Sequence, residues 1–195
     1  DFDGTVFGDG DFYKWMEAAV YTAVRSDNRE LLERLEEYVA LIGRAQQPDG
    51  YLDTYFIAAE PEHKWQNLTD CHEMYCAGHM TEAGVAYYQA TGKTKLLDIC
   101  CKLCDHIDRR FGREAGKVTG IPGHEEIELA LMKAYRATGD RKYYELADYF
   151  VENRGSRPGF LEEERFLELS GKEKWLGADY HQAHAKIRDQ KAAEG

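Results

Sequence analysis

The stretch TDCHEMYCAGHMTEAGVAYYQATG, residues 69–92, decides the fold. Thr69 or Asp70 can cap a helix that begins near His72. Glu73 can favour the positive end of the helix dipole and reach back to free amide hydrogens. Apolar residues then follow at helical spacing up to the final glycine, which is a typical residue for a helix end. We therefore predict a long helix that begins in polar residues and continues into a buried core.

The same 3.6-residue period of apolar side chains recurs on both sides of this helix. It predicts five further helices, at residues 11–25, 31–43, 94–111, 124–138 and 140–153. All four prolines lie in the predicted connections, as the steric cost of proline inside a helix requires. The chain is therefore predicted to be all-α.

The chain contains an internal repeat. YYQATGKTKLLDICCKLCD, residues 87–105, aligns with AYRATGDRKYYELADYFVE, residues 134–152, so that the Ala-Thr-Gly of 90–92 falls on that of 137–139. A repeated helical hairpin can stack into an open solenoid or close into a ring. The long connections favour a ring, because they can gather at one mouth and build a pocket there.

This reasoning sets the expected organisation of the chain. Residues 1–155 should form three helical hairpins, about half of an (α/α)6 six-hairpin toroid. Residues 156–195 should form a charged, partly irregular tail with a short helix at 160–170. Neither end looks natural, so we expect a piece of a longer protein. A half toroid leaves apolar helix faces uncovered, which predicts association with the missing half or self-association.

Charge and composition narrow the classes of partner. Lys and Arg number 25 against 36 Asp and Glu, for a formal net charge of −11, and the two signs are interspersed. Nucleic acids and anionic membranes need concentrated positive charge, so neither is an expected partner. A membrane helix needs roughly 18 continuous apolar residues, which no stretch approaches. A neutral sugar or other small molecule fits this balance better.

The five cysteines are odd in number and confined to two predicted helices. Such a pattern is a poor disulfide framework, which predicts reduced thiols and a cytoplasmic location. Cys71, His72, Cys76 and His79 raise the question of zinc, because i, i+4 spacing on a helix can hold two ligands. Cys76 and His79 instead fall where the hairpin needs core residues of small or medium size. We therefore predict no metal in this segment.

Two histidines are the main candidates for a site. His72 and His124 each follow a long connection at a predicted helix start, and each precedes acidic residues. Taken singly, either could be a helix-start residue bonded to a local carboxylate or carbonyl. Equivalent positions in successive hairpins would aim both imidazoles at one mouth, which favours a functional pair.

A polar turn precedes the long helix. Gln46, Gln47, Asp49 and Tyr51 combine amide, carboxylate and phenol groups beside a glycine. These groups bind sugar hydroxyls in many sites, although a polar turn can also be only a turn. Gln47 and Asp49 are therefore candidate substrate-binding residues beside the two histidines.

Three strings carry a resemblance to a known family: QQPDGYLDTYF (46–56), HEMYCAGHMTEAGVAYYQATGK (72–93) and IPGHEEIELALMKAYRATGDRKYYELADYFVENRG (121–155). Together they resemble glycoside hydrolase family 127, the β-L-arabinofuranosidases built on a six-hairpin toroid with β-sandwich domains behind it. By this resemblance, His72 and His124 match histidines that hold the arabinofuranose ring. The resemblance also implies a retaining mechanism, with a zinc-steadied cysteine thiolate as nucleophile and a glutamate as acid/base.

The chain departs from that pattern after Gly155, where nothing matches the later family segment with paired cysteines and a glutamate-cysteine motif. The resemblance therefore implies the N-terminal part of a catalytic toroid. This part would bind terminal arabinofuranosyl groups of plant-derived glycans, lack the nucleophile, acid/base and zinc, and be inactive alone.

Two alternatives stay open. The first is a scaffold that binds a protein partner through its concave face, and the second is a toroid that acts on another sugar as hydrolase or epimerase. If the chain is part of an enzyme, His72, His124 and the 46–56 loop should converge on one pocket.

Overall fold

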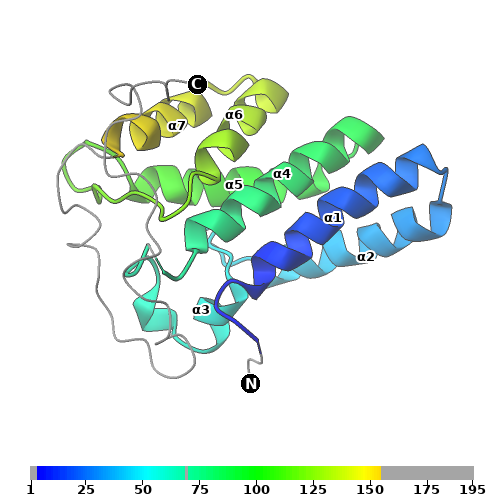
Figure 1. Cartoon of the computed structure of the whole chain (residues 1–195), viewed down its shortest axis with the longest axis horizontal. Coiled ribbons are helices and arrows are strands. Elements are labelled where there is room, and N and C mark those ends of the chain that lie inside the picture. Colours follow the sequence, from blue (N-terminus) through cyan, green and yellow to red (C-terminus); the bar gives the residue numbers. More distant parts are fainter. Residues whose placement is uncertain (1–3, 69, 155–195) are drawn as a thin grey trace, which may run out of the picture.

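The computed structural model describes residues 4–68 and 70–154 as an array of helices (Figure 1). The longer helices are α1 (Gly8–Arg25), α2 (Arg29–Ala45), α4 (Glu73–Thr91), α5 (Lys95–Arg110), α6 (Ile127–Thr138) and α7 (Arg141–Asn153). Two short elements, α3 (Thr54–Ala58) and the 3-10 helix η1 (Pro61–His63), lie between α2 and α4. The described residues form no strand beyond an isolated bridge between Phe111 and Val118, so the all-α prediction is confirmed. The predicted tail at 156–195, with its helix at 160–170, lies outside the described residues.

The helices pair as hairpins that stand side by side, α1 with α2, α4 with α5 and α6 with α7 (Figure 1). One layer contains α1, α4 and α6, with α4 packed between the other two. The second layer contains α2, α5 and α7, with α5 in the middle. This two-layer order is that of successive hairpins in a helical toroid, as the sequence predicted.

The central position of α4 follows from its sequence. Small and apolar side chains occur all round this helix from Cys76 to Tyr87, and nearly all are buried. Apart from His79, Thr81 and Glu82, these residues are small or apolar, and a helix with apolar side chains on most of its surface belongs in a core. Gly84 lets α5 approach closely, because a Cβ at this position would lie 2.4 Å from the Sγ of Cys100.

The repeat predicted from the sequence has a structural counterpart. Gly92 after α4 and Gly139 after α6 have left-handed backbones, with φ of 73° and 76°. Each amide donates to the carbonyl four residues earlier, on Tyr88 and Tyr135, at 2.8 Å. Both hairpins of the repeat therefore turn by the same αL cap.

Several helix boundaries differ from the predictions. α1 begins at Gly8, before the cap expected at Asp11. α2 continues through Gly43 to Ala45. Gly43 does not end the helix but admits α5, since a Cβ there would lie 3.1 Å from Cδ1 of Ile99. α6 begins at Ile127, so the predicted start at residue 124 was wrong by three positions.

α4 begins where the sequence predicted, near His72, but its capping residue differs from the prediction. Its N-cap is His72, whose side chain makes no cap hydrogen bond, and the helix begins at Glu73. Asp70 therefore does not cap α4, and Thr69 lies outside the described residues. The connection before α4 makes its own hydrogen bonds, which are described below with the site.

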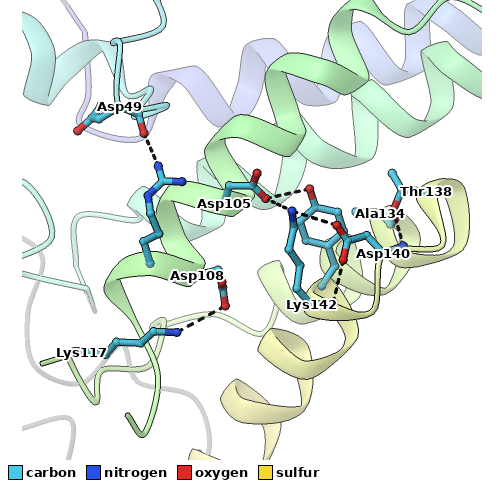
Figure 2. A network of polar contacts seen from close by, with 10 residues as sticks. Asp49, Asp105, Asp108, Lys117, Ala134, Thr138, Asp140 and Lys142 are labelled. Atoms are coloured by element: carbon cyan, nitrogen blue, oxygen red, sulfur yellow. Dashed lines mark hydrogen bonds and ion pairs between the residues drawn. The ribbon is translucent and has the colours of Figure 1, made fainter. Parts of the chain in front are cut away.

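Polar contacts join α5 to α7 on the second layer (Figure 2). The Nζ of Lys142 lies 2.8 Å from Oδ1 of Asp105 and 3.0 Å from Oδ2 of Asp140. Asp108 pairs with Lys117 of the following loop at 3.7 Å. These ion pairs are partly exposed and contribute little stability each.

The hairpins at the two ends of the array expose large apolar side chains. These are Trp15, Tyr21 and Val24 of α1, Leu41 of α2, Leu129 of α6 and Tyr144 of α7. In residues 4–68 and 70–154, no helix combines the length and apolar character needed to cross a membrane.

Candidate functional site

The structure brings His72 and His124 together. Their Nε2 atoms are 2.8 Å apart, and the ring centroids are separated by 4.6 Å. His72 immediately precedes α4, and His124 belongs to the connection before α6, although 52 positions separate them in the sequence. The backbone amide of Gly123 also donates to the carbonyl of Leu68 at 3.2 Å, so the two connections are joined beside the pair.

The backbone of His72 is strained. Its φ of 61° and ψ of 21° are left-handed, a conformation that costs a residue with a Cβ about 1–2 kcal/mol. Such an outlier persists only where the surrounding contacts determine it, and these outliers cluster at functional sites. Sequence periodicity does not report this feature, because it concerns which residues are helical and not how the chain enters the helix.

Hydrogen bonds assign the protons of the two imidazoles. Nδ1 of His72 lies 2.6 Å from the carbonyl oxygen of Asp70, which can only accept, so this nitrogen carries the hydrogen. Nε2 of neutral His72 is then an acceptor, and His124 donates to it from its own Nε2–H. The pKa of His72 is lowered to about 4, chiefly by burial. The bond to Asp70 acts in the opposite direction, and the neighbouring His124 acts in the same direction as burial. The pair therefore presents one acceptor and one donor near neutral pH.

Aromatic rings surround the pair. The ring of Phe7 lies 5.2 Å from that of His72, and the ring of Tyr75 lies 5.6 Å from His72 and 5.3 Å from His124. Lys14 of α1 donates to the Tyr75 hydroxyl at 3.1 Å. The sequence analysis missed these residues. Tyr75 follows His72 by three positions, a helical spacing that could have found it, whereas Phe7 carries no such signal.

A buried arginine holds the connection that carries His124. Arg154, directly after α7, is fully buried, and its Nη2 donates to the carbonyl of Pro122 at 3.0 Å and to Oε1 of Glu128 at 3.1 Å. Arg154 directly follows the helix predicted at 140–153, and nothing in the sequence pointed to a role for it. A lone basic residue at a helix end gives no signal of burial.

The turn with Gln47 and Asp49 makes its described contacts within itself and with α5. Nε2 of Gln47 lies 3.5 Å from the Ala45 carbonyl, and the Asp49 carbonyl accepts from Arg109 at 2.7 Å (Figure 2). None of these contacts is with the imidazole pair. The turn reaches the start of α4 through Tyr51, so a sugar-binding role for Gln47 and Asp49 stays a prediction.

The sequence suggested that Glu73 reaches back to the free amides at the start of its own helix. In the structure it does not. Its carboxylate is buried and accepts from the Tyr51 hydroxyl at 2.5 Å and from the Trp65 amide at 2.7 Å. Burial raises the pKa of Glu73 to about 8, while these two hydrogen bonds act in the opposite direction. This residue is the point where the 46–68 connection is fastened to α4.

One group of described side chains has the donors for a metal. His79 and Glu82 of α4 and Glu126 before α6 place one ligand atom each within 4.8 Å of one another. Glu82 is already paired with Lys133. Burial, together with the adjacent Glu82, raises the pKa of Glu126 to about 8. A divalent cation could bind here only by displacing that proton and the Lys133 ammonium. The His79 side chain is largely buried, as expected for a residue at a core position, and it faces this polar group.

The described thiols lie in the core. Cys71, Cys76, Cys100 and Cys104 are buried, and burial raises the pKa of the Cys76, Cys100 and Cys104 thiols. The Cys100 thiol donates to the Met80 carbonyl at 3.3 Å. Protonated, buried thiols are poor metal ligands and poor nucleophiles.

Comparisons with known proteins agree with this architecture. The family described as "Beta-L-arabinofuranosidase, GH127 catalytic domain" matches residues 1–195. The chain is similar to the "Non-reducing end beta-L-arabinofuranosidase" of Bifidobacterium longum subsp. longum, with 41% identity over all of this chain and 31% of that protein.

Solved structures give the same result. The crystal structure of a GH127 β-L-arabinofuranosidase from Geobacillus stearothermophilus T6 is similar with a TM-score of 0.89 and 46% identity, over 98% of this chain and 30% of that one. A second GH127 β-arabinofuranosidase is similar with a TM-score of 0.75 and 37% identity, over 80% and 26% of the respective chains. The chain thus spans about a third of the length of these relatives. It belongs to glycoside hydrolase family 127, as a segment of the β-L-arabinofuranosidase catalytic domain.

Proposed function

We propose that this chain supplies part of the sugar pocket of a retaining glycosidase that removes terminal β-L-arabinofuranosyl groups. The 2.8 Å approach of Nε2 of His72 to Nε2 of His124 carries the proposal. Family membership supports the reaction class, and two relatives are named as β-L-arabinofuranosidases. Gln47 and Asp49 are proposed as further substrate ligands on the neighbouring turn.

The pair has the polarity that a sugar hydroxyl needs. A hydroxyl is one donor and two acceptors, so it can donate to Nε2 of His72 and accept from Nε2–H of His124. One bound hydroxyl would thus take the place of the hydrogen bond between the two rings, because it gives the acceptor on His72 a donor and the donor on His124 an acceptor. The bond to Asp70 keeps the His72 tautomer fixed during this exchange. The rings of Phe7 and Tyr75 beside the pair would contact apolar faces of the sugar.

The residues of this chain do not fit the zinc-thiolate chemistry that the family resemblance implies. Cys71, Cys76, Cys100 and Cys104 are buried and Cys101 is half-buried. Burial raises the pKa of the Cys100, Cys101 and Cys104 thiols. The thiol of Cys76 is directed at the Phe7 carbonyl, 3.7 Å away, and not at the histidine pair. We therefore derive no catalytic step through zinc on this chain. The nucleophile, the acid/base and the metal are proposed to come from the rest of the domain, and the chain is proposed to be inactive alone.

The remaining expectations follow from the same picture. The substrate would be a carbohydrate, and the apolar side chains exposed on α1 and α6 would pack on the rest of the toroid or, in its absence, on another copy. A cytoplasmic location is proposed from the odd number of cysteines, which makes a poor disulfide framework.

Turnover of an aryl β-L-arabinofuranoside by the full-length protein tests the proposal. The wild-type protein should release the aryl group, and H124A should lower kcat/KM about tenfold to a hundredfold, because one hydrogen bond to a polar substrate group is lost. Its thermal midpoint should remain close to that of the wild type. Normal kinetics in H124A would remove the site assignment, and turnover of only a different sugar would favour another reaction of the toroid.

A further inference from the structure

We propose that Glu73 is a positioning residue that holds His72 in its left-handed conformation and so fixes the His72 imidazole in the sugar site. This inference rests on the proposed function of the histidine pair and adds a residue that does not itself touch the sugar. It assigns a task to a buried carboxylate that neither caps its helix nor neutralises a cation within it.

The carboxylate of Glu73 has two donors, both from the connection that precedes α4. The Tyr51 hydroxyl donates to Oε1 at 2.5 Å and the Trp65 backbone amide donates to Oε2 at 2.7 Å. Both donors are themselves rigidly held. Tyr51 is fully buried with its ring edge-on to Trp65 at 5.3 Å, and the Trp65 indole donates to Nε2 of His106 at 3.1 Å.

The other side of His72 is also anchored. The amide of Asp70 donates to Oδ1 of Asn67 at 2.9 Å, and Nδ2 of Asn67 donates back to the Asp70 carboxylate at 3.2 Å. The Cys71 amide donates to the Asn67 carbonyl at 3.2 Å. His72 is therefore the strained residue between two hydrogen-bonded anchors, with Glu73 as the anchor on its helix side.

The consequence is a division of roles. Asp70 selects the tautomer of His72 by accepting its Nδ1–H. Glu73 holds the peptide that follows His72, because its side chain cannot move without breaking the bonds to Tyr51 and Trp65. With those bonds removed, the backbone of His72 can relax to a right-handed helical conformation, and its imidazole would leave Nε2 of His124.

Steady-state kinetics of the full-length protein on an aryl β-L-arabinofuranoside test this role. E73L removes both acceptors, E73Q keeps one carbonyl oxygen for the Trp65 amide, and Y51F removes one donor while leaving Glu73 intact. Y55F is the matched control, since the buried Tyr55 also donates to a buried carboxylate, Oε1 of Glu60 at 3.0 Å, in the same connection. KM is the decisive quantity, because a partly unfolded sample lowers the maximal rate but leaves KM unchanged.

We expect E73L to raise KM about tenfold or more, because the displaced His72 imidazole would lose its hydrogen bond to the bound sugar. Y51F should raise KM by a smaller factor, E73Q should recover most of the wild-type value, and Y55F should leave KM unchanged. If E73L does not fold, the KM of Y51F decides. Wild-type KM in Y51F and in any folded Glu73 variant, with H124A still impaired, would overturn the positioning role and leave the proposed function standing. Absence of wild-type turnover would overturn both.

Discussion

Arg154 and Glu128 form an ion pair inside the protein, with Nη2 of the guanidinium 3.1 Å from Oε1 of the carboxylate. Both side chains are buried, and the same guanidinium nitrogen donates to the Pro122 carbonyl. The pair connects the end of α7 to the first turn of α6 and to the segment that carries His124. The position of one imidazole therefore depends on a residue thirty places further along the chain.

Removing Arg154 should destabilise the protein strongly. R154A leaves the Glu128 carboxylate buried without its partner, which costs about 3–5 kcal/mol in comparable pairs. Replacing Glu128 as well, in R154A/E128A, should recover part of this loss. Thermal or denaturant unfolding of the full-length protein measures both. K142A is the control on the same helix, where a partly exposed ion pair to Asp105 should be worth at most about 1 kcal/mol. Equal losses in R154A and K142A would contradict the structural role of Arg154.

The turn that carries Gln47 and Asp49 depends on Gly50. Its φ is 93°, and a Cβ there would lie 2.4 Å from the Lys102 carbonyl oxygen of α5. Gly116 has a similar φ of 92° with no neighbour within 4 Å of a Cβ. Both G50A and G116A should lose about 1 kcal/mol of folding stability, because alanine is strained in a left-handed backbone. G50A should lose about 1–3 kcal/mol more, because its Cβ clashes with α5.

Kinetics of the same two variants test the proposed sugar-binding turn. If Gln47 and Asp49 bind the substrate, G50A should raise KM while G116A should not. Unfolding midpoints that fall equally in both variants would show that the turn does not press on α5 as described.

Local periodicity predicted the helices and their pairing because it reports which faces are buried. The backbone conformation at the start of each helix was harder to predict from the sequence. The left-handed backbone of His72 and the start of α6 after His124 depend on contacts with the preceding connections, which no spacing encodes. Glu73 could be recognised as a helix-start acid, but its partners Tyr51 and Trp65 are fixed only by tertiary packing.

Protonation of His72 should make the folded protein less stable in acid. Burial lowers its pKa from 6.5 to about 4, so between these values the unfolded chain binds a proton that the folded chain does not. Stability therefore falls as pH decreases from about 6.5 to about 4, by up to about 1.4 kcal/mol per pH unit from this group. H72N removes the titration while keeping a residue that tolerates a left-handed backbone. The unfolding free energy of the wild type should therefore fall relative to that of H72N as the pH decreases over this interval. Parallel pH profiles of the two proteins would contradict the lowered pKa of His72.

Glu126 should act in the opposite sense. Burial and the adjacent Glu82 raise its pKa to about 8 from 4.5, so the folded chain holds a proton that the unfolded chain releases. Stability then falls as pH rises from about 4.5 to about 8. E126Q resembles the protonated acid and should become more stable relative to wild type across this range. The exposed Glu33 of α2 provides the control E33Q, which removes a carboxylate at the surface of the protein. A pH-independent difference for E126Q would contradict the raised pKa of Glu126 in the folded protein.

The most direct test of the account is a crystal structure of the full-length protein with β-L-arabinofuranose bound. We predict sugar hydroxyl oxygens within about 2.6–3.2 Å of Nε2 of both His72 and His124, with Nδ1 of His72 still bonded to the Asp70 carbonyl. A sugar bound out of reach of both imidazoles would contradict it.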